Sequence, residues 1–292
     1  MELHKAGQDL DKRDFFHYLL GAVDPETGKG FETVELWGEA NVLMIAGSDT
    51  TSSALAATLY YLVSNPEKLH ALQNEVRAKF HSVGEIVSGK EMMECVYLRA
   101  CIDEAMRLCP PVPGLLPREV NNPQGMTIPA ATLPSNAPRS HGKIHLPMGT
   151  TLGVNIYTIH HSPTHYPEPF CFLPERWLLP TDHPHGIATQ NSLERARAAF
   201  TPFSIGSRGC IGKALAMMEL RLVLARMAWE WEMERIEGVQ GKTECWDGGF
   251  RWEGTDEHGK EEGWKGEFRI FDHFTTRKEG PVVAFRRRII DS

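Results

Sequence analysis

The sequence predicts a mainly α-helical protein with a small β component. Three observations support this: a long apolar run with helical periodicity over 31–64, two helical runs before residue 110, and a return to helix over 213–235. Most of the 19 prolines lie between residues 110 and 192, which indicates loops, hairpins and a meander. No internal repeat is present, so a single domain, 1–292, is expected.

The helices have recognisable ends. A short helix is expected over 14–20, before a glycine. Pro66 ends the long helix and opens the next one, to about Phe80, at the favoured first-turn position. Another helix is expected over 91–108, because the prolines that follow cannot continue it.

Short β-like runs occur in the second half of the chain. Residues 143–146 and 150–155 are expected to be strands within the proline-rich region. A terminal hairpin is expected from 268–274 and 282–285, around a Gly-Pro pair.

Charge and composition exclude several classes of function. The chain has 31 Lys+Arg and 38 Asp+Glu, a formal charge of −7, which argues against nucleic acid as a partner. No stretch approaches the roughly 18 apolar residues of a membrane span, and the charged start carries no signal peptide. The six cysteines include no C-x-x-C pair, so neither a zinc ribbon nor a redox motif is indicated.

The segment 203–212 (FSIGSRGCIG) is the most informative one. Its three glycines let the backbone turn tightly and approach a flat ligand. Cys210 precedes a helix that begins near residue 213, where free amides and the dipole favour a thiolate by about 0.3–1 kcal/mol, and Arg208 adds a cation. One cysteine without a second ligand fits haem iron better than zinc, which needs about four ligands. The alternative is a free cysteine packed in a glycine loop.

A polar segment, 47–53 (GSDTTSS), interrupts the long apolar helix. Its residues are together roughly 4 kcal/mol less helix-favouring than alanine. One interpretation is a break between two helices, with Ser48 or Asp49 as N-cap. The other is one helix, locally opened by hydroxyls that bond to backbone carbonyls. In that case Asp49 and Thr50 would face a cavity, hold water and relay protons.

Two further motifs carry charged residues. Glu104 and Arg107 are three residues apart and share a helix face. Arg176, in the loop 174–177 (PERW), would give Glu104 a second cationic partner. Each motif alone is a weak signal, because an exposed ion pair contributes only about 0–1 kcal/mol.

Taken in order, the four motifs resemble the signature set of the cytochrome P450 haem-thiolate monooxygenases. The segment around Cys210 is similar to the family's F-x-x-G-x-R-x-C-x-G at every defined position. The PERW form most resembles fungal members. The resemblance implies the cytochrome P450 fold, with an oxygen-binding helix at 31–64, a meander at 160–200 and a haem-binding loop at 203–212.

The resemblance also implies a cofactor, haem b (iron protoporphyrin IX), and the residues that hold it. Cys210 would be the axial iron ligand, whose electron donation favours O–O cleavage. Phe203 would pack beside the thiolate, and Arg208 and Arg118 would contact the haem propionates. The remaining residues of the expected haem environment are Gly206 and Gly212 in the loop and Ala46 and Gly47 above the haem.

Two further groups take roles from the family. Asp49 and Thr50 match the acid–alcohol pair that delivers protons to bound oxygen. Glu104, Arg107 and Arg176 match a structural triad that locks the meander beneath the haem, as scaffold and not as catalysts.

The implied function is haem-dependent insertion of one oxygen atom of O2 into a small organic substrate. The resemblance implies electrons from NADPH through NADPH–cytochrome P450 reductase, at the endoplasmic reticulum membrane. The alternative is a catalytically impaired, truncated homologue that binds haem poorly. A cysteine hydrolase is disfavoured, because no histidine is placed by motif to activate Cys210.

Measured against the family pattern, the chain is expected to be truncated at the N-terminus and complete at the C-terminus. Membrane association would depend on an anchor absent from this chain, which leaves a cytosolic location open. Missing partners of the long helix would leave apolar surface exposed. The segments 127–142 and 239–266 have no counterpart in the family pattern and are interpreted as insertions.

Two weaker signals remain. His160, His161 and His165 form a small cluster that suggests a metal site, although a loop before the meander is the favoured interpretation. The basic residues that flank the cysteine loop would face either an acidic electron donor or solvent; they are Arg195, Arg197 and Lys213.

Overall fold

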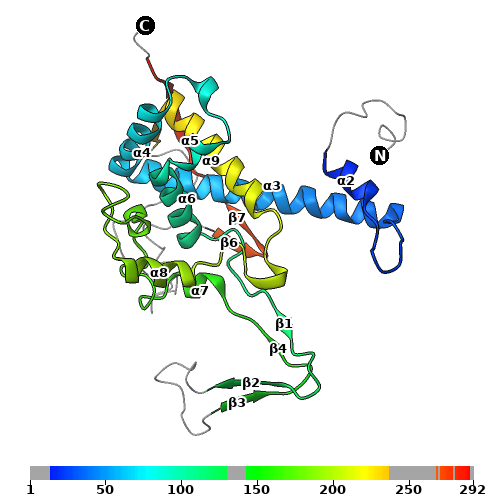
Figure 1. Cartoon of the computed structure of the whole chain (residues 1–292). Coiled ribbons are helices and arrows are strands. Elements are labelled where there is room, and N and C mark those ends of the chain that lie inside the picture. Colours follow the sequence, from blue (N-terminus) through cyan, green and yellow to red (C-terminus); the bar gives the residue numbers. More distant parts are fainter. Residues whose placement is uncertain (1–13, 130–142, 237–267, 269, 279, 290–292) are drawn as a thin grey trace, which may run out of the picture. The chain divides into compact units, whose positions relative to one another are not determined.

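The computed structural model describes residues 14–129, 143–236, 268, 270–278 and 280–289. The protein is mainly α-helical, and the described residues include four two-stranded antiparallel sheets (Figure 1). The predicted fold class is therefore confirmed. The chain divides after Asp49 into two compact units, 1–49 and 50–292. Within the described ranges, no helix combines the length and the apolar character that crossing a membrane requires.

Helix α3 (Thr33–Ser64) runs without interruption through the polar segment 47–53. The interpretation as a break between two helices is therefore wrong. The hydroxyl of Ser48 donates to the carbonyl of Ile45 at 3.4 Å, so it bonds back to the helix instead of capping a new one. Before this helix, a short one, α2 (Phe15–Gly21), is capped by the side chain of Asp14.

Burial changes along α3. Ala57 and Leu62 are fully buried near its C-terminal end. Val34 and Met44, in its N-terminal part, are 79% and 65% exposed. The long helix therefore does expose apolar side chains, as expected from the sequence.

The helix expected over 91–108 is in fact two helices, α5 (Lys90–Met93) and α6 (Val96–Leu108). Cys95 separates them, because its backbone (φ −73°, ψ 80°) lies outside the helical region. Upstream, α4 (Pro66–Lys79) begins at its proline as predicted, and a 3-10 turn, η1 (Val83–Glu85), follows.

A carboxylate on α4 caps the start of α6. Cys95, at the N-cap of α6, makes no side-chain capping bond. Glu75 instead accepts hydrogen bonds from the N–H groups of Tyr97 and Leu98, both at 2.8 Å. Burial raises the pKa of Glu75 above its ordinary value, against these hydrogen bonds, which lower it. The cap therefore ties the start of α6 to a side chain from another helix.

Replacement of Glu75 by glutamine is expected to lower the free energy of unfolding by about 1–2 kcal/mol, because one carbonyl oxygen cannot replace a two-oxygen anionic cap. Equilibrium unfolding in urea measures the change. Glu119→Gln, at an exposed position, is the control and should change stability by less than about 0.5 kcal/mol. Equal effects of the two substitutions would contradict a capping role for Glu75.

Two short hairpin-like pairings occupy the proline-rich region. Strand β1 (Arg118–Glu119) pairs with β4 (Thr151–Leu152), and β2 (Met126–Pro129) pairs with β3 (Lys143–Leu146). The segment interpreted as an insertion, 127–142, therefore begins inside a paired strand. Its residues 130–142 and the whole of 239–266 lie outside the described residues.

The segment 160–200 contains two regular elements besides loops, and a third leads into it. Helix α7 (Ile156–His160) leads into it, the 3-10 turn η4 (Pro174–Trp177) lies in its middle, and α8 (Gln190–Ala199) closes it. Thr189 and Ser192 form a reciprocal capping box at the start of α8.

The C-terminal pairings differ from the prediction. Helix α9 (Lys213–Glu230) ends five residues before the expected 235, and Trp231–Arg235 forms strand β5. Strand β5 pairs with β8 (Val283–Arg287), whereas β6 (Ile270–His273) pairs with β7 (Thr275–Lys278). The predicted hairpin of 268–274 with 282–285 is therefore wrong, since the last strand pairs with a residue run some fifty positions upstream.

Helix α6 lies at the centre of the core. It contacts α4, α7, α9 and η4, and eleven of its residues are buried. Glu104 and Arg107 are both 0% exposed. Two charged side chains on this helix therefore have no access to water and need partners from other elements.

Candidate functional site

The structure brings together Glu104, Arg107 and Arg176, the three residues expected to form a triad. Nη2 of Arg107 lies 2.8 Å from Oε1 of Glu104, and Nε of Arg176 lies 3.0 Å from the same oxygen. Helix α6 supplies the first two side chains and η4 the third. The three side chains are between 0% and 9% exposed.

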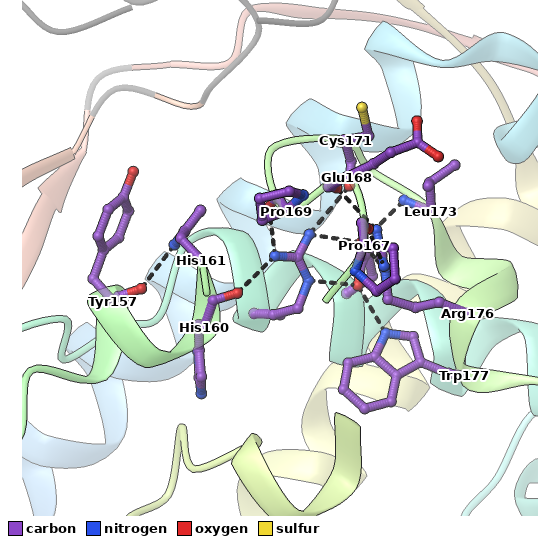
Figure 2. Close-up of polar contacts among 12 residues, drawn as sticks. Tyr157, His160, His161, Pro167, Glu168, Pro169, Cys171, Leu173, Arg176 and Trp177 are labelled. Carbon is purple, nitrogen blue, oxygen red and sulfur yellow. Dashed lines mark hydrogen bonds and ion pairs between the residues drawn. The ribbon is translucent and has the colours of Figure 1, made fainter. Parts of the chain in front are cut away.

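Three more donors complete the shell of Glu104. Nε of Arg107 (2.9 Å) and the indole Nε1 of Trp177 (2.8 Å) donate to Oε2. The N–H of Leu173 donates to Oε1 at 3.0 Å. Trp177 and Leu173 come from the segment that follows α7, and both are labelled in Figure 2. A buried carboxylate with this many donors is stabilised as an anion.

Both guanidinium groups also bind the backbone of segment 160–171. Figure 2 shows the residues of this segment that supply the carbonyls, together with Arg176. The acceptors are His160, Pro169 and Cys171 for Arg107, and Pro167 and Glu168 for Arg176, at 2.6–3.1 Å. The ion cluster (Glu104, Arg107 and Arg176) therefore holds the path of the meander through its main chain.

The electrostatics of the ion cluster keep its groups charged. Burial by itself would raise the pKa of Glu104, but Arg107 and Arg176 outweigh it, and the pKa lies below its ordinary value. Burial would likewise lower the pKa of Arg107, but Glu104 outweighs it, and the pKa is raised. Two cations share one anion, and the backbone carbonyls take the remaining donors.

The cysteine loop, 203–212, lies between α8 and α9 and is closed by one backbone hydrogen bond. The N–H of Cys210 donates to the carbonyl of Phe203 at 2.8 Å. Gly206 has φ +74°, and no atom lies within 4 Å of where its Cβ would be. Ser204 also has a positive φ, of 58°, although it is not glycine. The loop therefore combines a strained turn with an open backbone surface.

The thiol of Cys210 is free and exposed. It stands just before Lys213, the first residue of the 18-residue helix α9. A Cβ at Gly212 would lie 3.8 Å from the sulfur, an ordinary van der Waals distance, so Gly212 faces the thiol without a side chain between them. The loop thus presents one exposed thiol just before a helix N-terminus.

The structure also places the other charged and aromatic residues expected at the haem. Nζ of Lys213 lies 5.7 Å from the centroid of the Phe203 ring. Arg208 is exposed, and no carboxylate among the described residues pairs with it. Arg118, on β1, is exposed and donates to the carbonyl of Pro117 at 2.9 Å.

The other expected residues lie on α3. Ala46, Gly47 and Asp49 are exposed, and Thr50 is half-buried. No atom lies within 4 Å of where a Cβ of Gly47 would be.

The histidine cluster does not form a metal site among the described residues, where no group of three His, Cys, Asp or Glu side chains could hold an ion. Nδ1 of His161 lies 2.8 Å from the carbonyl of Tyr157, and the two rings stack. His160 is fully buried and makes different contacts. The basic residues Arg195, Arg197 and Lys213 are all exposed.

Sequence reasoning missed two residues of this region. Trp177 belongs to a motif, but nothing in the pattern indicated that its indole N–H binds Glu104. The sequence suggested His160 only as a metal ligand, although its carbonyl accepts from Arg107. One feature of the sequence could have indicated the contact of Trp177 with Glu104. Trp177 directly follows Arg176, so its indole N–H, a hydrogen-bond donor, is next in sequence to the cation expected to bind Glu104.

The fold and these residues define a known class of protein. A family model described as Cytochrome P450 matches residues 1–248. The chain belongs to the cytochrome P450 family.

Particular relatives are fungal proteins named cytochrome P450 monooxygenases. One from Gibberella zeae is 39% identical over 279 residues, which cover 96% of this chain and 57% of the relative. Another, apf7 of Gibberella fujikuroi, is 36% identical over 277 residues, covering 95% of this chain and 47% of the relative. The protein lcsN of Purpureocillium lilacinum is 35% identical and is covered to 74%. The chain spans about half the length of the first two.

A solved structure supports the fold. A crystal structure of a cytochrome P450 superposes with a TM-score of 0.71 at 21% sequence identity, covering 99% of this chain and 54% of that one. Family membership implies a haem cofactor, an organic substrate and a redox partner in general terms.

The residues present fit a haem. A lone free thiol is exposed at the start of α9, the backbone at Gly206 is open on its Cβ side, and Arg208 offers an exposed cation to a propionate. A zinc site would need about four ligands, and no such group exists among the described residues.

Proposed function

We propose that the chain binds haem b through the thiolate of Cys210 and inserts one oxygen atom of O2 into a small organic substrate. The observation that carries this is the cysteine loop, which combines an exposed free thiol with an open glycine backbone and a closing Cys210–Phe203 hydrogen bond. The monooxygenase names of the relatives support the same activity.

The residues expected to hold the haem would have separate tasks. Cys210 would ligate the iron, and Phe203 would pack beside the sulfur and limit its access to water. Arg208 and Arg118 would bind the propionates, Gly206 and Gly212 would let the backbone approach the ring, and Ala46 and Gly47 would leave room for the haem. When bound, the haem supplies the activation of dioxygen that monooxygenation requires.

Asp49 and Thr50 supply protons. The carboxylate of Asp49 takes protons from solvent, since its side chain is exposed, and the hydroxyl of the half-buried Thr50 holds the next proton position. Glu104, Arg107 and Arg176 take no part in proton transfer, because all three are buried and their polar atoms are committed to one another and to the meander.

Electrons come from NADPH through NADPH–cytochrome P450 reductase, at the endoplasmic reticulum membrane. The exposed cations Arg195, Arg197 and Lys213 flank the cysteine loop and suit an acidic electron donor.

The test is a reduced, CO-bound difference spectrum of the purified chain with added haem. We expect the red-shifted Soret band typical of a thiolate ligand, and complete loss of that band in Cys210→Ala. Cys171→Ala is the matched control, because Cys171 is also a free cysteine and offers only its backbone carbonyl to Arg107. Its band should persist.

Two results would overturn the proposal. Absence of a thiolate band at any haem concentration would favour the alternative, a homologue that binds haem poorly. An unchanged band in Cys210→Ala would show that another group is the ligand.

A further inference from the structure

His160 joins the ion cluster to the cysteine loop. It is fully buried at the C-terminal end of α7. Its carbonyl accepts from Nη1 of Arg107 at 2.9 Å, and its ring Nε2 accepts from the backbone N–H of Thr201 at 3.0 Å. Figure 2 shows the carbonyl and the ring of His160 pointing in different directions. One residue therefore binds two separate structures through two different atoms.

The bond to Thr201 continues into the loop. The carbonyl of Thr201 accepts from the N–H of Ser204 at 3.0 Å. The adjacent Phe203 accepts from the N–H of Cys210 at 2.8 Å. The position of Thr201 thus sets where the turn begins, and the turn sets where the sulfur-bearing residue lies.

Packing fixes the ring of His160. It stacks on Phe200, with centroids 5.4 Å apart and an interplanar angle of 25°. It meets the edge of Tyr166 at 6.4 Å. Because Nε2 accepts from Thr201, the proton of the neutral ring lies on Nδ1, which has no hydrogen-bond partner among the described residues. The ring keeps this tautomer although its Nδ1–H has no hydrogen-bond partner among the described residues. The acceptor at Nε2 is the ring atom that binds the N–H of Thr201.

We propose that His160 is a positioning residue that holds the cysteine loop in register with the ion cluster through the Nε2–Thr201 hydrogen bond. The consequence of this role for haem binding rests on the proposed function, in which Cys210 is the iron ligand. A packing role and a positioning role make opposite demands on the side chain, and this difference makes the proposal testable.

Two substitutions separate the roles. His160→Phe keeps an aromatic ring for Phe200 to stack on but removes the acceptor. His160→Gln loses the ring but keeps an acceptor at a similar distance along the side chain. If His160 positions the loop, His160→Gln should preserve the loop better than His160→Phe. If His160 only packs, His160→Phe should preserve the loop better than His160→Gln.

The first readout uses the full chain without haem. Amide hydrogen exchange of the peptide 200–210 is followed by mass spectrometry. In His160→Phe the Thr201 N–H loses its acceptor, and exchange in this peptide should be about tenfold faster or more than in the unsubstituted chain. In His160→Gln it should stay within about threefold. Equal exchange in His160→Phe and the unsubstituted chain would overturn the proposal.

The second readout uses the haem-loaded chain. The share of bound haem that gives the thiolate-type band in the reduced CO spectrum should fall in His160→Phe and recover in His160→Gln. If the thiolate-type band is retained in His160→Phe but lost in His160→Gln, the proposal is overturned and His160 has a packing role. If the unsubstituted chain itself lacks the band, the proposed function fails, and the exchange experiment still decides whether His160 holds the loop.

A variant on the other side of the bond covers a failure of His160→Phe to fold. Thr201→Pro removes the donor N–H and leaves His160 unchanged. Its peptide 200–210 should exchange faster than in the unsubstituted chain, by a factor similar to that expected for His160→Phe, because the same bond is lost from the donor side. An unchanged exchange rate in Thr201→Pro would overturn the proposal.

Discussion

Replacement of Glu104 by glutamine is expected to destabilise the fold by about 3–5 kcal/mol, a loss large enough to threaten folding itself. The amide has no charge, so Arg107 and Arg176 become two buried cations without an anion. The amide NH2 would also face donors at a position where the carboxylate oxygen only accepts. The size of this destabilisation depends on leaving two buried cations without a neutralising charge, rather than on the strength of one ion pair.

Equilibrium unfolding in urea measures this effect. Glu234→Gln is the matched control, because Glu234 forms an ion pair with Arg286 in which the side chains are 71% and 75% exposed. Its effect should stay below about 1 kcal/mol. If the two variants lose similar stability, the ion cluster is not the structural centre that its burial indicates.

Acidification is expected to destabilise the protein through His160 before Glu104 titrates. Burial, followed by the positive charges of Arg107 and His161, lowers the pKa of His160 from 6.5 to about 3, against Glu104, which acts to raise it. Between these values the unfolded imidazole binds a proton and the folded one does not. Stability from this group is therefore fully present above pH 6.5 and falls as the pH drops toward 3, by about 1 kcal/mol per pH unit.

Urea unfolding at a series of pH values between about 7 and 4.5 measures this slope. The variant His160→Gln has no group that titrates at this position, so its stability should fall less steeply over the same range. Glu104 acts in a different window: its pKa is lowered, so its contribution is present above its ordinary value of 4.5 and is lost only at lower pH. Parallel slopes in the two proteins would contradict the assignment to His160.

Local patterns in the sequence predicted much of the helical framework. Apolar periodicity and prolines placed α3 and α4 to within two residues, because these signals act within a few turns of the helix itself. The three-residue spacing of Glu104 and Arg107 was enough to predict that they share a face. The same spacing contained no information on whether that face is exposed, which decides whether the pair is worth nothing or several kcal/mol.

The pairing of strands was not predictable in the same way. The pattern favours helix where strand β5 forms, and it favours a different hairpin for β5's partner, β8. Strand pairing depends on residues far apart in the chain and on which faces are covered by other elements, and a short run does not encode either. Cys95 likewise divides two helices by its backbone conformation, at a position with no glycine or proline to mark it.

The sequence by itself determined the family signature: the cysteine loop, the polar segment of the long helix and the residues of the ion cluster are all defined by short spacings. The pairing of Arg176 with Glu104 was expected from the motifs and is present. Only the tertiary structure decided that the indole of Trp177 also reaches Glu104, from more than seventy positions away. It also decided that His160 binds Arg107 with its carbonyl and Thr201 with its ring. The physical reason is burial, because a charged or polar group removed from water takes whichever partner the folded chain brings to it.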